Sequence, residues 1–465
     1  MSEVNDSFRD KISTVNEKGK RIWIFPKKPK GNYFNARKVI SYFLLVLLFS
    51  GPHIRINGQP FLLLNILERK FVILGKVFWP QDMYLFAILL IVGVVFVILF
   101  TIIFGRIFCG WVCPQTIFME MLFRRIEYLI DGDWTEQRRL KDSKWTWTKI
   151  WKRSLKFSIF LIISFLIANT FLAYIIGSKE LWKIQHDPIG EHIGGFIAIS
   201  IFTFVFFSVY MWLREQVCTT ICPYGRLQGV LLDKNTMVVA YDSKRGEPRS
   251  KIHKNEDRSS AGKGACIDCL QCVHVCPTGI DIRNGTQLEC INCTACIDEC
   301  NHMMDAVNQE KNLIRFVSEN GIKAGTPFQW TLRVKAYSAV LLGLFIVFGA
   351  LLITRKDFET NIIRQRGSTY SIDNKGIVSN IFEVDILNKT QEDYQISLKS
   401  TDPQVEIEVV GGHIFLESEA ETKERIVVKV PNSLLKDGVK KLKIEVYGNG
   451  EKVDEVKTKF IGPLL

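Results

Sequence analysis

The chain has 465 residues, a formal net charge of +12 and 47% hydrophobic residues. Its length suggests about three domains of roughly 150 residues. A mean hydropathy of +0.11 excludes a disordered tail protein and an ordinary soluble enzyme. The apolar residues gather in long blocks, which we interpret as membrane spans.

The chain opens with a basic tail over residues 1–35, followed by an apolar block at Val39–Pro52. This block is short for a span and gains length from its flanks, and an interfacial helix is the alternative. Four longer blocks are long enough to cross a bilayer core, which takes about 20 apolar residues. They are Met83–Phe104, Phe157–Gly177, Gly194–Leu213 and Tyr337–Thr354. None of the five contains a charged residue or His, which disfavours an ion or proton transporter.

The distribution of Lys and Arg predicts the orientation of these spans. The tail and the loops Gly105–Lys156 and Arg214–Arg333 are basic, whereas Ser178–Ile193 has only two lysines. The positive-inside rule therefore places the tail and both basic loops in the cytoplasm, and the C-terminus outside. No cleavable signal is apparent, because the first apolar block lies behind the long tail. The basic charge is thus explained by topology, without a nucleic-acid partner.

Residues 36–235 are expected to form a four-span membrane core with two Cys-x-x-x-Cys-Pro motifs. The motif cysteines are Cys109, Cys113, Cys218 and Cys222, which follow the second and fourth spans. On a helix this spacing puts both sulfurs of a pair on one side. Thiolates select soft ions, Cu(I) above all, so the four are a candidate catalytic thiol or copper site. Buried structural cysteine, a third cluster and a reversible disulfide are the alternatives.

Residues 236–334 carry the most specific motif, two runs of four cysteines. The runs are Cys266-x-x-Cys269-x-x-Cys272-x-x-x-Cys276-Pro277 and Cys290-x-x-Cys293-x-x-Cys296-x-x-x-Cys300. In bacterial two-cluster ferredoxins the fourth Cys of each run ligates the other cluster. The predicted ligands are Cys266, Cys269, Cys272 and Cys300 for one [4Fe–4S] cluster, and Cys290, Cys293, Cys296 and Cys276 for the second. Zinc is the alternative, but this spacing fits tetrahedral zinc poorly.

Residues 335–355 hold the fifth span, and residues 356–465 are predicted to form an outer β domain. Short alternating runs separated by turns such as Gly411-Gly412 favour an immunoglobulin-like sandwich of about seven strands. The predicted fold is therefore a multidomain membrane protein. It has about five transmembrane helices, a cytoplasmic two-cluster ferredoxin-like domain and a C-terminal all-β sandwich.

Several motifs together resemble one family. They are Phe78-Trp79-Pro80-Gln81-Asp82, the run from Phe104 to Gln115, Cys222-Pro-Tyr-Gly-Arg226 and the double cluster motif. The combination resembles the cytochrome c oxidase accessory proteins of the FixG/CcoG/RdxA group over nearly the whole chain. The resemblance places the family's cluster ligands on the eight cysteines from Cys266 to Cys300. Asn301 stands where the second run would normally have Pro.

The resemblance implies a bacterial inner-membrane protein that reduces Cu(II) to Cu(I) during maturation of a cbb-type haem–copper oxidase. The expected partners are copper ions or copper chaperones, the oxidase assembly machinery and an electron donor that the sequence does not reveal. Two other functions stay open. One is a quinol-linked electron-transfer subunit of the NapH or NosR kind, and the other is a non-enzymatic assembly scaffold.

Overall fold

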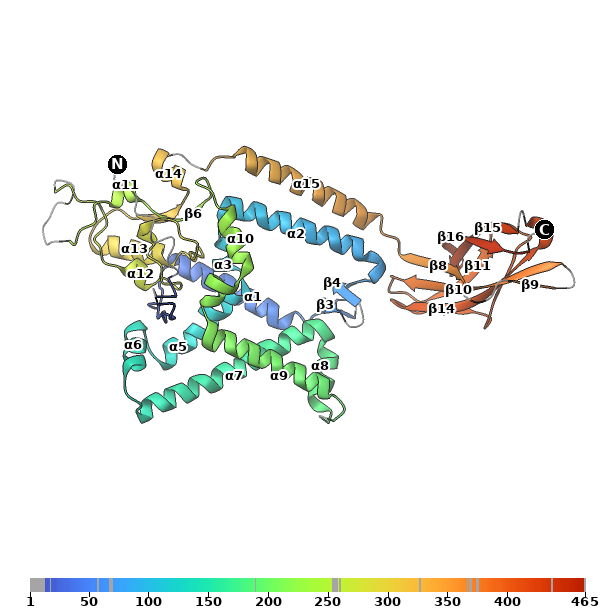
Figure 1. Ribbon diagram of the computed structural model, residues 1–465, viewed down its shortest axis with the longest axis horizontal. Coiled ribbons are helices and arrows are strands. Elements are labelled where there is room, and N and C mark those ends of the chain that lie inside the picture. The colour runs from blue at the N-terminus through green and yellow to red at the C-terminus, as the bar shows by residue number, and fades with distance from the viewer. Residues whose placement is uncertain are drawn as a thin grey trace. The chain divides into compact units, whose positions relative to one another are not determined.

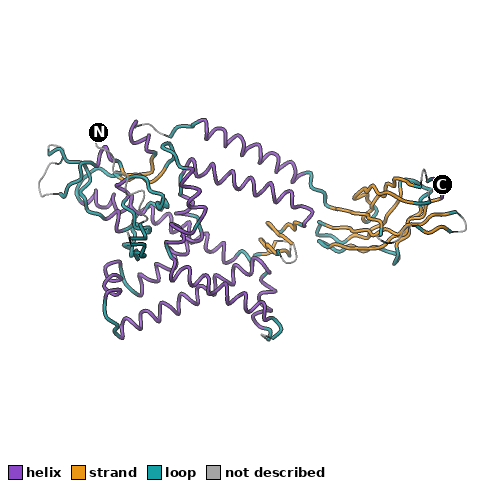
Figure 2. Tube along the Cα trace, viewed as in Figure 1, coloured by secondary structure: helices purple, strands orange, loops and turns teal. Residues whose placement is uncertain are grey.

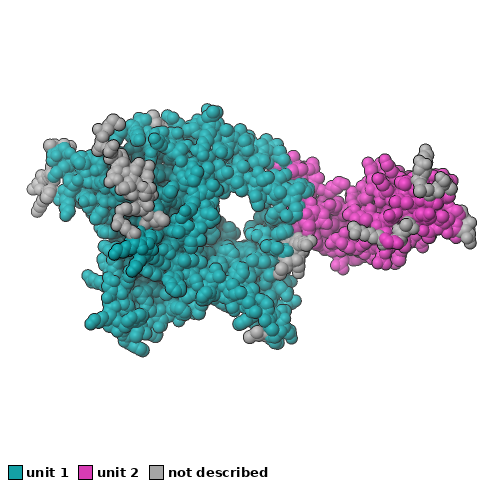
Figure 3. All heavy atoms as spheres, in the orientation of Figure 1, with its two compact units in different colours: residues 1–76, 83–347 teal, residues 77–82, 348–465 magenta. Residues whose placement is uncertain are grey.

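The computed structural model describes residues 13–16, 18–56, 58–66, 70–188, 190–252, 258, 261–325, 328–365, 367, 370–373, 376–435 and 438–463. Residues 1–12 of the predicted basic tail lie outside these ranges. The chain divides into two compact units, which Figure 3 shows in different colours. The first contains Met1–Lys76 and Met83–Val347, and the second contains Val77–Asp82 and Phe348–Leu465.

Five helices are long and apolar enough to cross a membrane. They are α1 (Asn32–Ser50), α2 (Met83–Phe104), α7 (Trp147–Ile176), α9 (Ile193–Ser208) extended by η4 (Val209–Leu213), and α15 (Leu332–Ile353). The prediction of a multi-pass protein with about five spans is confirmed. The first block proved longer than Val39–Pro52, since α1 has 19 residues.

Local sequence sets the limits of the longest helix, α7, and aromatic packing joins it to α9. The helix begins after Thr146, whose hydroxyl accepts a hydrogen bond from the Lys149 backbone N–H, and ends at Gly177 with φ +89°. α7 and α9 lie against each other (Figure 1). Phe157 and Phe207 meet there with ring centroids 4.7 Å apart.

The first unit also contains short helices and strands that connect and cap the spans. The N-terminal ones are β1 (Arg55–Ile56), β2 (Gln59–Pro60), β3 (Leu62–Asn65), β4 (Lys70–Ile73), α3 (Ile107–Trp111), α4 (Pro114–Ile117), η3 (Phe118–Phe123), α5 (Arg124–Ile130), α6 (Trp134–Asp142) and α8 (Ser178–His186). The later ones are η5 (Val217–Ile221), α10 (Pro223–Leu231), β6 (Val238–Tyr241), α11 (Ser243–Gly246), α12 (Gln271–His274), η6 (Ile282–Asn284), α13 (Ala295–Ala306), β7 (Ile314–Val317) and α14 (Glu319–Ala324). Strand β5 (Lys76–Phe78) and the turn η2 (Pro80–Asp82) precede α2.

The cysteine-rich part of the first unit is built around a small sheet and the helices α12 and α13, which contact each other. Strand β6 pairs antiparallel with β7, from Val238 opposite Val317 to Tyr241 opposite Ile314. Most of the chain between β6 and α13 is loop (Figure 2). Its buried core combines aliphatic side chains such as Ile297 with cysteines of both runs. The cysteines therefore form part of the core instead of projecting into solvent.

The second unit is a sandwich of two antiparallel sheets, which confirms the predicted all-β, Ig-like fold. One sheet has the order β12 (Glu406–Val409), β14 (Glu421–Pro431), β10 (Ile377–Asn388), β8 (Phe358–Arg364), with β9 (Ser371–Ile372) also paired to β10. The other has the order β13 (Ile414–Leu416), β11 (Tyr394–Ser400), β15 (Val439–Gly448), β16 (Glu451–Ile461). Alternate residues of β10 face the core, where Phe382 and Phe460 are fully buried.

Candidate iron–sulfur and thiol site

The two cysteine runs adopt the same unusual backbone. In the first run Asp268 and Leu270, on either side of Cys269, have φ of 52° and 58°. In the second run Asn292 and Thr294, on either side of Cys293, have φ of 51° and 65°. Left-handed residues other than glycine are strained by about 1–3 kcal/mol each and persist only where the surroundings impose them. The repeated conformation coils each loop so that its cysteines face inward.

Each run contributes to two small apolar cavities. Cys266, Cys269, Cys272 and Cys300 line one cavity, together with aliphatic side chains such as Ile267 and Met304. The other cavity is lined by Cys276, Cys290, Cys293 and Cys296, and Cys272 borders it as well. Both cavities thus combine the three closely spaced cysteines of one run with the last cysteine of the other.

This donor set fits two [4Fe–4S] clusters, which four thiolates each would hold. Burial raises the pKa of Cys293 to about 11 and those of Cys290 and Cys300 to about 12. Such thiols stay neutral at pH 7 unless a bound cation favours the thiolate. Bound clusters would supply one-electron redox chemistry here. The division of the eight ligands between two clusters remains a prediction, which the two cavities support.

The structure gives a reason for Asn301 after the second run. Helix α13 continues through Cys300 and Asn301 to Ala306, and proline inside a helix removes a backbone donor and clashes with the preceding turn. The Asn301 carboxamide oxygen instead accepts a hydrogen bond from the Asn312 backbone N–H at 2.8 Å. In the first run the helix ends at His274, so Pro277 falls outside it.

The two Cys-x-x-x-Cys-Pro motifs also repeat one another in backbone geometry. The N–H of Cys113 donates to the carbonyl of Phe108 at 2.9 Å, and the N–H of Cys222 donates to the carbonyl of Val217 at 2.8 Å. Both bonds span five residues, which is one π-type turn. Cys113 and Cys222 then cap α4 and α10, each with proline at the first helical position. The pairs therefore lie on a turn and a helix cap, whereas the sequence suggested that a single helix carries each pair.

The fold brings these two motifs together from positions more than a hundred residues apart. Cys109 donates from its Sγ to Oε1 of Gln228 on α10 at 2.9 Å, and Thr116 on α4 lies 4.0 Å from the Sγ of Cys218. Burial, with a smaller contribution from the neighbouring Cys113, raises the pKa of Cys218 to about 12. Burial also raises the pKa of Cys109 to about 11, against the opposing effect of Arg106. Cys109 is influenced electrostatically by Cys113 and Cys222, and Cys218 by Cys113 and Cys109, so the four thiols lie near one another.

The four sulfurs do not form a compact group of three or more metal ligands. Among the residues that the structure describes, one group of three or more metal-ligating side chains has all its ligand atoms within 4.8 Å of one another. That group is Asp187, Glu191 and His192, part of it exposed. No three of the twelve cysteine sulfurs, all of which are described, meet this limit.

The thiol site lies directly against the second cluster cavity. Cys109, Val275, Ile291 and Cys293 share one buried apolar cluster. Gly110 permits this approach, because a Cβ at this position would lie 2.9 Å from the Cα of Cys293. The Gly110 carbonyl accepts a hydrogen bond from Nε of the buried Arg37 at 2.6 Å.

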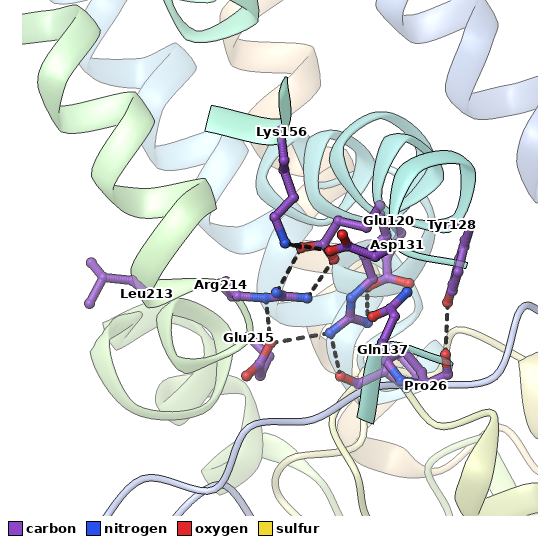
Figure 4. Close-up of polar contacts among 12 residues, drawn as sticks. Pro26, Glu120, Tyr128, Asp131, Gln137, Lys156, Leu213, Arg214 and Glu215 are labelled. Carbon is purple, nitrogen blue, oxygen red and sulfur yellow. Dashed lines mark hydrogen bonds and ion pairs between the residues drawn. The ribbon is translucent and has the colours of Figure 1, made fainter. Parts of the chain in front are cut away.

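A buried ionic network holds the membrane helices to the ferredoxin-like part (Figure 4). Arg214, just before the second motif, donates from both terminal nitrogens to the Glu127 carboxylate at 2.9 and 2.8 Å. Arg124 donates to Glu215 at 3.2 Å and to the carbonyl of Pro277, next to Cys276, at 3.1 Å. Burial alone would raise the pKa of Glu127, but Arg214, Lys156 and Arg124 together hold it below its usual value.

The described part of the basic tail contacts the same region. Lys27 pairs with Glu299 at 2.9 Å, and its backbone N–H donates to the His274 carbonyl at 2.7 Å. Asp298 accepts hydrogen bonds from the N–H groups of Tyr33 and Phe34 at 3.2 and 2.8 Å, which caps α1. The tail therefore has a packing role in addition to its charge.

The sequence analysis assigned no role to Gly110, Gln228, Arg106 or Arg214. Arg106 is buried and donates to the Leu288 carbonyl, in the loop that leads to Cys290. The signal available in the sequence was an Arg shortly before each cysteine pair. Gln228, one turn beyond the second motif, carries no sequence signal of its own.

Comparison with known proteins agrees with this architecture. Residues 213–319 match the family described as a 4Fe-4S dicluster domain, residues 86–134 a 4Fe-4S binding domain, and residues 348–463 the Ig-like fold at the C-terminal of FixG. The chain is 34% identical to protein RdxA of Cereibacter sphaeroides, over 81% of this chain and 82% of RdxA. The chain belongs to the FixG/RdxA family.

Two more members of the FixG/RdxA family show similar coverage. The nitrogen fixation protein FixG of Rhizobium meliloti is 31% identical over 82% of this chain and 79% of its own length. Protein RdxB of Cereibacter sphaeroides is 32% identical over 82% of this chain and 83% of its own length. The chain is therefore a multi-pass membrane protein that transfers electrons through iron–sulfur clusters, with a 4Fe–4S dicluster domain.

Proposed function

We propose that this FixG/RdxA-family protein reduces Cu(II) to Cu(I) and thereby serves the assembly of a cbb-type cytochrome c oxidase. The observation that carries the proposal is the gathering of four soft ligands, Cys109, Cys113, Cys218 and Cys222, beside the second cluster cavity. Thiols favour the cuprous product over the cupric substrate.

The reaction needs one electron for each copper ion and no proton. Cu(II) accepts the electron and leaves as Cu(I), while an external donor, a soluble reductant or a quinol, is oxidised. The chain's own residues keep the route short, since Gly110 brings the thiol site against the loop of Cys293. Arg106 adds a fixed positive charge beside both sites. Cu(II) would be reduced at or near the four thiols.

The proposed orientation follows from the charge distribution. The basic tail and the cysteine-rich domain face the cytoplasm of a bacterial inner membrane, and the β domain faces the periplasm. Copper ions or a copper chaperone would then exchange at the cytoplasmic membrane edge. The oxidase assembly machinery is the proposed partner of the outer β domain.

Anaerobic copper reduction tests the proposal directly. Protein reduced with dithionite and freed of excess reductant should convert Cu(II) to Cu(I), followed with a Cu(I)-specific chromophore. The C109S/C113S variant should be slower by tenfold or more, because two of the four soft ligands are lost. The matched control is V112A, since Val112 lies between these cysteines and is 38% exposed. An unchanged rate in C109S/C113S would remove the thiols from the reaction.

The same preparation separates the alternatives. Oxidation of quinol by the protein without any dependence on copper would favour a quinol-linked electron-transfer subunit. Loss of oxidase assembly on deletion of residues 358–465, with copper reduction retained, would favour a scaffold.

A further inference from the structure

We propose that Cys109, Cys113, Cys218 and Cys222 together ligate a third [4Fe–4S] cluster, in addition to the two of the dicluster domain. The inference rests on the electron-transfer role described above and does not depend on copper as the acceptor. Copper would then take its electron from this third cluster, and the four thiols would not be its ligands.

The first support is the convergence of two half-sites. Neither motif alone offers more than two thiols, and a [4Fe–4S] cluster takes four. Gln228 and Thr116 each connect one motif to a cysteine of the other, at 2.9 and 4.0 Å. The two iron–sulfur family matches, residues 86–134 and residues 213–319, each contain one pair. The fold joins the pairs into one set of four.

The second support is the separation of the sulfurs. Four thiolates around one tetrahedral ion at about 2.3 Å would lie about 3.8 Å from one another. No three described cysteine sulfurs lie within even 4.8 Å of one another. The eight cysteines of the dicluster domain share this wide spacing, which suits a ligand set that surrounds a cluster of four irons. All twelve cysteines are free, so no disulfide closes the site.

The third support is the surroundings of the four thiols. Cys109 is buried, and two side-chain donors beside Cys113, the indole N–H of Trp111 and the amide of Gln115, are buried without a hydrogen-bond partner in the described structure. Hydrogen bonds to cluster sulfur atoms are a common way to tune such centres. A cluster here would give these donors acceptors that the protein itself does not provide.

The proposed third cluster would lie beside the second cluster cavity, which itself borders the first. Cys272 borders both cavities of the dicluster domain, and Gly110 brings the thiol site against Cys293 of the second cavity. A third cluster would therefore extend the electron route from the cysteine-rich domain to the ends of the membrane helices. This extension explains why two chain segments that flank different spans carry the same motif.

Iron and acid-labile sulfide analysis of anaerobically purified protein tests the inference. Wild-type protein should hold about 12 irons per chain, four for each of three clusters. The variants C109S/C113S and C218S/C222S should each fall to about 8, and the quadruple variant should fall no further. This non-additivity follows only if both pairs hold one cluster. V112A and T220A, at exposed positions inside the motifs, should keep all the iron.

Native mass spectrometry and spin quantitation of the reduced wild-type protein give readouts that need no variant to fold. A bound mass of three clusters and about three spins per chain would support the inference. About 8 irons in the wild type, additive losses in the two double variants, or copper or zinc bound in place of iron would overturn it. If the protein holds about 8 irons and still reduces copper, this inference alone is contradicted. If it holds about 12 irons and fails to reduce copper, the copper proposal alone is contradicted.

Discussion

The backbone of Gly110 lies against that of Cys293 so closely that no side chain fits between them. A Cβ on Gly110 would lie 2.9 Å from the Cα of Cys293 and also overlap the Ile291 carbonyl. The first membrane-edge motif and the loop of the second cluster cavity therefore meet through main chain. Movement of one must displace the other.

G110A should destabilise the protein by about 1–3 kcal/mol, because the added methyl group would clash with backbone atoms of Ile291 and Cys293, which cannot rotate away as a side chain could. We expect a lower thermal unfolding temperature for the cluster-containing unit, followed by the loss of the clusters' visible absorbance. The control is G93A in α2, where a Cβ would have no neighbour within 4 Å. Equal unfolding temperatures for G110A and G93A would contradict the packing argument.

Breaking the ion pair between Arg214 and Glu127 should lower the free energy of unfolding strongly, since both side chains are buried. R214M leaves the Glu127 carboxylate without its two shortest contacts, and a buried pair broken in this way costs about 3–5 kcal/mol. Denaturant unfolding in detergent measures the loss. K183A, which breaks the exposed pair with Glu180, should change stability by less than about 1 kcal/mol. Similar effects from the two variants would show that the network contributes little.

Acid should remove the same stabilisation. The pKa of Glu127 in the folded protein lies below its ordinary value of 4.5. The ionised carboxylate therefore stabilises the fold fully above about pH 4.5, and this contribution disappears as the pH falls through the lowered pKa. The difference in unfolding temperature between wild type and E127Q should shrink on acidification from pH 7 to pH 3. A difference that stays constant or grows would refute this account of Glu127.

The β domain offers a pair of adjacent positions with opposite exposure. Phe382 is fully buried in the sandwich, whereas its neighbour Ile381 on β10 is 37% exposed. F382A should lower the local opening free energy by about 3–5 kcal/mol, and I381A by much less. Hydrogen–deuterium exchange of β10 and β14 peptides measures both. Iron content should be unchanged in the two variants, since no cysteine lies in this unit.

Features that depend on a short stretch of sequence could be predicted from the sequence alone. The spans follow from hydropathy, and the cysteine runs follow from spacing. The limits of the helices were less predictable, because α1 and α7 begin in polar sequence that precedes the apolar block. Arg37, for example, lies in α1 and is buried against Gly110. A hydropathy window excludes such a residue although the helix includes it.

The meeting of the two membrane-edge motifs could not be deduced, because it depends on tertiary contacts. Cys109 and Gln228 are separated by 119 positions, and no local pattern states that they touch. The network around Glu127 is equally non-local, since Arg214 approaches from 87 positions away. Sequence reasoning identified which residues carry chemistry, and the fold determined which of them act together.

The cap that Asp298 places on α1 has a consequence for biosynthesis. Tyr33 leaves the ribosome 265 residues before its capping carboxylate is made. The first transmembrane helix must therefore be inserted while its leading N–H groups still depend on water. The contact can form only after the second cysteine run has been synthesised, which ties the last step in fixing the first span to the metal-binding part of the chain.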